Sequence, residues 1–197
     1  MMIYLLMIYL LMIFNFWFGG NILIKIIMIF DQIQSGLGTK DDKMLALGGS
    51  KEAIGPAVML APYLKDIDAK VVACLYCGDG TYSENPEIVR EKLCSKLEKL
   101  NPDIVICGPS LNYEGYSKMC AEIAYDINEK TNIKAIAAMS KENEQILSNY
   151  KDKILIVETP KKGGTGLNDS LKNIVKVVKK VYDKEEFNSI KEEFCFK

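Results

Sequence analysis

The sequence predicts an α/β protein, a three-layer sandwich in which a mostly parallel five-stranded sheet lies between helices. Short apolar runs alternate with longer stretches whose apolar residues recur at helical spacing. Glycine, proline and asparagine separate most of these segments. Of the 197 residues, 49% are hydrophobic and 26% are charged, which is enough apolar material for one domain with its own core.

Five short runs are predicted to be buried strands, because they are apolar throughout rather than alternating. They are residues 22–30, 69–76, 103–107, 133–139 and 154–157. Such strands, separated by helices, are typical of a parallel sheet covered on both faces. Periodicity does not decide between a flavodoxin-like and a Rossmann-like strand order.

Five stretches between and after the strands have the apolar spacing of helices. They are residues 53–64, 86–100, 116–128, 141–149 and 169–182. Pro62 is expected to kink or end the first helix, Pro86 suits the first turn of the second, and Ser140 is expected to cap the fourth. The connections are predicted as loops, at residues 31–50, 77–85 and 159–168.

Residues 1–21 are a hydrophobic N-terminal extension outside the predicted domain. Residues 1–18 are almost wholly apolar, and the first charge is Lys25. Three explanations stay open: a mis-assigned start, which we favour because translated AT-rich DNA has this composition; a membrane anchor, for which the length suffices; and a core helix. The domain is placed at residues 22–182. The charged tail, residues 183–197, is expected to be frayed or to begin a missing part.

Charge and histidine content exclude several classes of function. The 25 Lys and Arg nearly cancel the 26 Asp and Glu, so there is no electrostatic reason to expect nucleic acid as a partner. The chain has no histidine. This excludes Ser-His-Asp and Cys-His catalysis and histidine metal sites. We expect no cofactor.

The six cysteines are irregularly spaced, which predicts reduced thiols and a cytoplasmic protein, unless residues 1–18 tether it to a membrane. Cys74 and Cys77 have the spacing of a redox pair. Within a strand, however, they would lie on opposite faces, so Cys74 is interpreted as a core residue. Because Cys77, Cys107 and Cys120 form no CxxC pairs with one another, they are not expected to form a metal site.

In a doubly wound sheet, ligands bind at the carboxyl ends of the strands, so the loops after the strands form the candidate site. The first loop contains Gly36 and Gly38 but lacks both nucleotide-binding glycine patterns, so a mobile surface loop is the favoured interpretation. Glu114, Glu122 and Asp126 could face a partner, but a solvated helix face is the favoured explanation.

Four segments resemble, in order, the N-terminal half of the selenocysteine-containing subunit of the glycine/sarcosine/betaine reductase component B family. They are GPAVMLAPYL, VVACLYCGDGTYSENPEIV, NPDIVICGPSLNYEGYSKMCAEIA and KILIVETPKKGGTGLNDSL. The most telling pieces are C-G-D-x-x-x-x-E-N from Cys77 and G-P-x-x-N-x-x-x-Y-x-x-x-C from Gly108. The positions carried over are substrate-side or interface candidates: Cys77, Gly78, Asp79, Glu84, Asn85, Gly108, Pro109, Asn112, Tyr116 and Cys120.

The resemblance implies a subunit or truncated domain of an anaerobic amino-acid-fermenting complex that reductively cleaves the C–N bond of glycine or an N-methylated glycine. Its implied partners are other reductase subunits, including a selenocysteine protein, with thioredoxin supplying electrons indirectly. The family's selenocysteine lies in the C-terminal half, and this chain has no equivalent. The chain could end at a UGA codon, be a fragment, or be a stand-alone domain, so no catalytic residue is assigned. The alternative is a non-catalytic small-ligand or flavin-type binding module.

Overall fold

The computed structural model describes residues 23–197, and its centre is one six-stranded sheet in the order β2-β3-β1-β4-β5-β6. The strands are β1 (Ile24–Phe30), β2 (Gly48–Ser50), β3 (Ala69–Tyr76), β4 (Ile104–Cys107), β5 (Lys134–Met139) and β6 (Ile156–Glu158). Five of them run parallel, as predicted, and the short β2 is an antiparallel edge strand on β3. The sequence analysis placed β2 in a loop because its Gly-Gly-Ser sequence has no strand propensity.

The strand order decides between the two predicted topologies. Without β2, the parallel strands lie in the order 2-1-3-4-5, which is the flavodoxin-like order. The direction of winding reverses between β1 and β4, so the connections that leave these two strands go to opposite faces of the sheet. A crevice opens at such a switch point, at the carboxyl ends of the strands.

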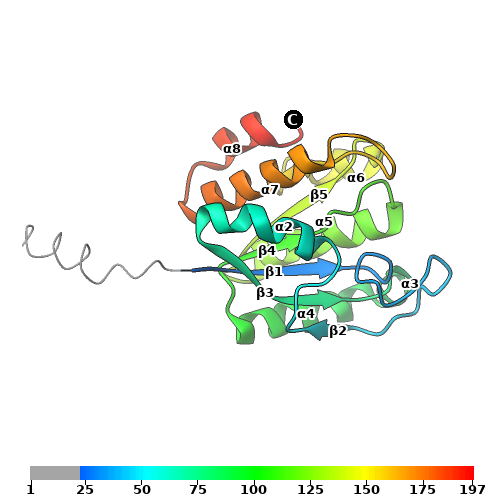
Figure 1. Cartoon of the computed structure of the whole chain (residues 1–197). Coiled ribbons are helices and arrows are strands. Elements are labelled where there is room, and N and C mark those ends of the chain that lie inside the picture. The colour runs from blue at the N-terminus through cyan, green and yellow to red at the C-terminus, as the bar shows by residue number, and fades with distance from the viewer. Residues whose placement is uncertain (1–22) are drawn as a thin grey trace, which may run out of the picture.

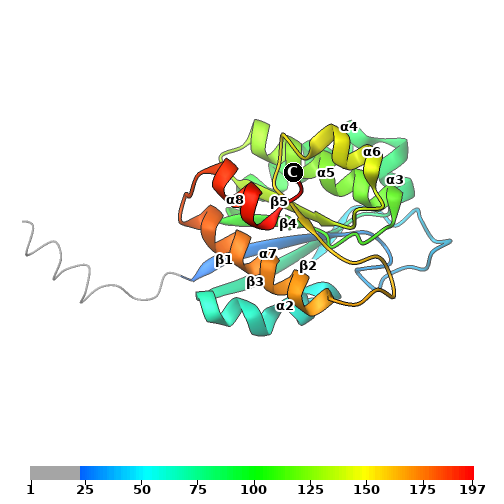
Figure 2. The same ribbon diagram turned by 90° about the horizontal axis from the view of Figure 1, so that it is seen from above.

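Helices cover both faces of the sheet (Figure 1). They are α2 (Pro56–Leu64), α3 (Asp79–Glu84), α4 (Pro86–Leu100), α5 (Glu114–Lys130), α6 (Glu144–Tyr150), α7 (Leu167–Tyr182) and α8 (Phe187–Phe194), with a short 3₁₀ turn at Lys65–Ile67. Buried residues of α2, α7 and α8 pack on one face, and those of α3, α4, α5 and α6 pack on the other. Figure 2 shows α2 and α7 side by side along the first of these faces.

Two expectations for the connections are wrong, and Pro62 lies two residues before the end of α2 rather than at it. Residues 79–84, predicted as part of a loop, form α3. Pro62 is exposed, so the Val58 carbonyl that it leaves without a partner can bond to water. Ser140 does not cap α6, because the N-cap residue is Asn143, whose amide donates to the carbonyls of Leu111 and Ser140.

The tail is ordered rather than frayed. Ile190 of α8 is 1% exposed and joins the core beneath α7. After α8, the Phe196 N–H donates to the Ile156 carbonyl at 3.1 Å, and Cys195 forms an antiparallel bridge with Val157. The tail therefore covers the edge strand β6. Ile190 and Phe194 lie one helical turn apart, which is the spacing of a helix with one apolar face. The many charged residues around them hid this pattern in the sequence.

A polar cluster joins the helices of the second face. Arg90 of α4 donates to Asp126 of α5 at 2.7 Å and to Glu122 at 3.2 Å, and the Tyr82 hydroxyl of α3 donates to Glu122 at 2.6 Å. The side chains of Glu122 and Asp126 are 17% and 10% exposed. The interpretation of these two carboxylates as a solvated face is therefore wrong, while Glu114 is exposed, as that interpretation expects.

Within residues 23–197, none of the helices combines the length and the apolar character needed to cross a bilayer. The three explanations offered for the N-terminal extension concern residues outside the described part of the chain.

Candidate functional site

A cleft lies at the carboxyl ends of β1, β3 and β4, where the winding reverses. It has a volume of about 520 Å³ and is lined by the loops after β1 and β4, by α3 and by the first turn of α5. A neighbouring hollow of about 360 Å³ shares Ile33, Lys40 and Tyr113 with it. We call the two together the switch-point cleft. Its charged lining side chains are Asp31, Lys40, Lys43, Asp79, Glu114 and Lys162.

Asp31 is the first residue after β1 and forms part of the floor of the switch-point cleft. It is only 1% exposed. Its Oδ1 atom accepts the Gln34 backbone N–H at 2.6 Å. Burial, together with the nearby charge of Asp79, raises the pKa of the Asp31 carboxyl from 3.8 to about 6. A buried carboxyl at a switch point is a recognised sign of a functional site.

Asp79 and Gln32 tie the loop after β1 to α3. The Gln32 side-chain amide donates to Asp79 Oδ1 at 3.0 Å, and its carbonyl oxygen accepts the Asp79 backbone N–H at 3.0 Å. Gly115 lies on the other side of Asp79: a Cβ atom at this position would lie 2.8 Å from Asp79 Oδ2. The loops after β1, β3 and β4 therefore converge on this carboxylate.

The rim of the switch-point cleft is cationic. Lys40 and Lys43 are exposed side chains of the loop after β1, and Lys162 belongs to the loop after β6. The ammonium of Lys162 lies 5.6 Å from the centre of the Tyr113 ring, and its interaction with the Tyr113 side chain raises the pKa of Lys162. A cleft with an acidic floor and a basic rim is complementary to a small zwitterion.

Two of the candidate glycines bring backbone segments close to the cleft. At Gly78, which precedes α3, a Cβ atom would lie 2.0 Å from the Lys43 carbonyl oxygen. At Gly108, where φ is +114°, a Cβ atom would lie 2.6 Å from the Ala138 carbonyl oxygen. Pro109, which follows Gly108 through a cis peptide bond, is buried. These residues shape the site without offering it a side chain.

Three other candidates lie in the core beneath the cleft. Cys77, Tyr116 and Cys120 are all 0% exposed. Burial raises the pKa of Cys77 to about 11 and the pKa values of Tyr116 and Cys120 well above their ordinary values. Neither of the two thiols is therefore a nucleophile at neutral pH. The Tyr116 hydroxyl donates to the Ile29 carbonyl at 2.8 Å and so ties α5 to the end of β1.

The last three candidates are exposed, and none of them lines the switch-point cleft. Glu84 ends α3, and Asn85 separates α3 from α4. Asn112 accepts the Lys162 backbone N–H at 2.8 Å, so it holds the loop that carries Lys162 to the rim. Of the ten candidates, only Asp79 presents a side chain to the cleft.

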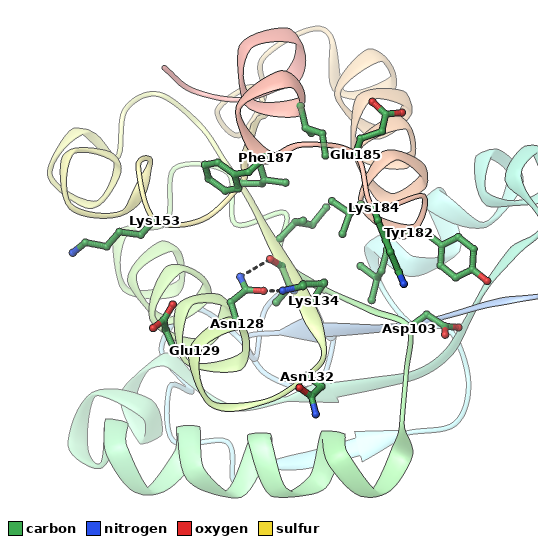
Figure 3. A pocket seen from close by; sticks show the side chains of 16 residues that line it. Asp103, Asn128, Glu129, Asn132, Lys134, Lys153, Tyr182, Lys184, Glu185 and Phe187 are labelled. Atoms are coloured by element: carbon green, nitrogen blue, oxygen red, sulfur yellow. Dashed lines mark hydrogen bonds between the residues drawn. The ribbon is translucent and has the colours of Figure 1, made fainter.

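A larger hollow lies at the opposite, amino edge of the sheet (Figure 3). It has a volume of about 730 Å³ and lies between the end of α5, the start of β5 and the α7–α8 turn. The Asn128 amide there bonds to both backbone groups of Ala135 at 2.9 Å, in place of a neighbouring strand. Since ligands of doubly wound sheets bind at the carboxyl edge, we place the site in the switch-point cleft.

Within the described residues, no three Cys, Asp or Glu side chains gather in a way that could hold a metal ion. The six cysteines are free thiols, and five of them are buried.

Sequence reasoning selected the loops of this edge but missed Asp31, Lys40 and Lys162 as side chains of the site. Asp31 had a usable signal, because it is a carboxylate directly after an apolar strand. Lys40 had none, since its approach to the cleft depends on how the loop after β1 folds. Lys162 belongs to a two-lysine loop that could hold an anion, although solvated charge is the more common explanation for such a loop.

Comparison with known proteins places this fold in context. Residues 23–197 match the sequence profile of a family described as "Glycine/sarcosine/betaine reductase selenoprotein B". The chain is 29% identical over 157 residues to the "Sarcosine reductase complex component B subunit beta" of Peptoclostridium acidaminophilum, which covers 80% of this chain and 35% of that protein. It is 28% identical over 169 residues to the "Glycine reductase complex component B subunit gamma" of Carboxydothermus hydrogenoformans, covering 86% of this chain and 38% of that protein.

A third relative, the "Betaine reductase complex component B subunit beta" of Peptoclostridium acidaminophilum, is 26% identical over 175 residues, covering 87% of this chain and 38% of that protein. The chain thus spans little more than a third of the length of the curated relatives it matches. No solved structure is significantly similar to it.

Proposed function

Because the chain belongs to the glycine/sarcosine/betaine reductase selenoprotein B family, we propose that it is the substrate-side part of a reductase complex that cleaves the C–N bond of a small amino acid. In this proposal, the switch-point cleft holds glycine or an N-methylated glycine. A selenocysteine-bearing polypeptide supplies the redox group.

The observation that carries this proposal is the charge arrangement of the switch-point cleft. Its floor carries Asp31 and Asp79, and its rim carries Lys40, Lys43 and Lys162. A glycine zwitterion has a cationic nitrogen and an anionic carboxylate, so it can pair with both sets of side chains. Binding a glycine zwitterion through these charged groups does not require a large apolar pocket.

The division of labour follows from the state of the thiols. Burial raises the pKa values of Cys77, Cys107 and Cys120, so these side chains stay protonated and inaccessible at neutral pH. We therefore propose that the electrons needed to break the C–N bond enter through the selenocysteine-bearing polypeptide rather than through these three thiols. We propose thioredoxin as their indirect source, and the cytoplasm as the compartment, which the free thiols favour.

A reconstitution assay tests this proposal. The chain and a selenocysteine-bearing partner are supplied separately and together, with thioredoxin as reductant, and the release of ammonia or amine is followed. Turnover is expected only from the mixture, and Asp79→Ala should reduce it by roughly tenfold or more. Asp41→Ala, in an exposed part of the first loop, is the matched control. Turnover by the chain alone would refute the division of labour, and a coloured, flavin-binding chain without turnover in any mixture would favour a binding module.

A further inference from the structure

Asp31 is a deeply buried carboxylate with an oxygen still free to bond. Among the described residues, its side chain makes one hydrogen bond, from the Gln34 N–H to Oδ1. Asp31 is nevertheless only 1% exposed, and it lines the cleft. Its other oxygen is not fully enclosed by protein atoms, so a ligand in the cleft can donate a hydrogen bond to it.

The charged and titratable groups around Asp31 set the sign of that ligand. Asp79, from α3, adds negative charge, and its Oδ1 is already bonded to Gln32. Tyr116 and Cys120 of α5 lie below and are uncharged at neutral pH, because burial raises the pKa values of both. A cation at the floor would therefore meet two carboxylates.

The remaining charged groups line the outer part of the cleft. Glu114 starts α5, and Lys40, Lys43 and Lys162 come from two loops. The three lysines suit the carboxylate end of a ligand whose cationic end reaches the floor. This fixes the direction in which an amino acid would bind.

We propose that Asp31 recognises the N–H groups of the substrate ammonium, so that the cleft selects primary and secondary amines over quaternary ammonium compounds. This inference rests on the proposed function and narrows its substrate class to glycine and its N-methyl derivative. A quaternary ammonium has no N–H to offer the free carboxylate oxygen, whereas a charge-assisted hydrogen bond to a carboxylate is strong.

The cleft also lacks the features that favour quaternary ammonium ligands. Such ligands are held by cages of aromatic faces. Tyr113 is the one aromatic residue lining the switch-point cleft in the described chain, and its ring already interacts with Lys162.

The proposal has a proton-linked consequence. Burial and Asp79 raise the pKa of Asp31 to about 6, and a bound ammonium would lower it again. Binding near pH 6 must then release a proton from Asp31, and affinity must rise as pH increases through this range.

Isothermal titration calorimetry with glycine, sarcosine and betaine, in buffers of different ionisation enthalpy, tests the inference. Glycine and sarcosine should bind roughly tenfold or more tightly than betaine. Proton release should be seen at about pH 6 and be absent at about pH 8. Asp31→Asn should abolish the proton release and most of the preference, while Asp42→Asn, exposed in the same loop, should change neither.

The binding preference and the proton release are measured on the unmodified chain, so they test the role of Asp31 even if the Asp31→Asn variant fails to fold. Equal affinity for betaine, binding without proton release, or no binding of any of the three would overturn the inference. If the reconstituted mixture still turns over in that case, the proposed function stands and only the role of Asp31 is lost. If neither binding nor turnover is seen, both fail.

Discussion

Gly78 shows how one residue without a side chain holds the site together. Its φ of −61° is open to any residue, so its backbone conformation does not require glycine. Its surroundings do: the Gly78 N–H donates to the Leu45 carbonyl at 2.8 Å, and the chain at Lys43 passes where a Cβ atom would lie. The loop carrying Lys43 can approach α3 only because this position has no Cβ atom.

Gly78→Ala is therefore expected to lower the free energy of unfolding by about 1–3 kcal/mol, since the backbone at Lys43 must move away. Urea denaturation measures this loss, and hydrogen exchange should show faster exchange of the amides of residues 43–45. Gly36→Ala, in the loop after β1 that also carries Lys43, is the control. Its φ of +72° costs about 1 kcal/mol, but nothing lies within 4 Å of the added Cβ. Equal losses, without faster exchange at residues 43–45, would contradict the steric explanation.

At the scale of elements, prediction succeeded where burial dominates. The five parallel strands and α4, α5 and α7 follow from continuous or helically spaced apolar residues. It failed for α3, β2 and α8. The Gly-Asp-Gly start of α3 has low helix propensity, β2 is two glycines and a serine, and α8 lies in a highly charged tail. Each of these three is held by tertiary contacts rather than by its own sequence.

The guanidinium of Arg90 links the helices α3, α4 and α5. Arg90 bonds to Asp126 and Glu122 while its side chain is only 17% exposed. Its removal leaves Glu122 without its nearest counter-charge and leaves Asp126 with Lys130, at 2.7 Å, as its remaining partner. Arg90→Met, which keeps most of the aliphatic volume, should destabilise the fold by about 2 kcal/mol, less than for a fully buried pair.

Thermal or urea unfolding of Arg90→Met, compared with Lys92→Met, measures this effect. Lys92 lies on the same helix and is exposed, so its substitution should change stability by no more than about 0.5 kcal/mol. Similar effects of the two substitutions would show that the cluster contributes little to the packing of the three helices.

At the scale of the whole molecule, the sequence predicted the edge of the sheet at which we propose the site, but not the side chains that line the switch-point cleft there. The rule that ligands bind beyond the carboxyl ends of parallel strands depends only on strand type, which the apolar runs reveal. The choice of side chains depends on the strand order and on how the loops fold. Cys77 and Tyr116, for example, sit at the correct edge and yet point into the core.

The buried Asp31 carboxyl should also make the free energy of unfolding depend on pH. In the unfolded chain its carboxyl titrates near 3.8, and in the folded protein at about 6. Between these values the folded state keeps a proton that the unfolded state has lost. The contribution of Asp31 to the free energy of unfolding is therefore largest below about pH 4. It falls as pH rises and levels off above about pH 6, lower by at most about 3 kcal/mol.

Asp31→Asn removes this titration, so the variant should be more stable than the unmodified protein at neutral pH and lose less stability between about pH 4 and 6. Urea denaturation across this range, on the unmodified protein, Asp31→Asn and Asp42→Asn, measures the difference. A buried carboxylate that binds a cationic ligand is expected to lower the stability of the ligand-free protein. Saturating glycine should then narrow the gap between the unmodified protein and Asp31→Asn at neutral pH, because it binds the folded state of the former more tightly. A variant that is less stable at neutral pH would show that Asp31 is a structural carboxylate.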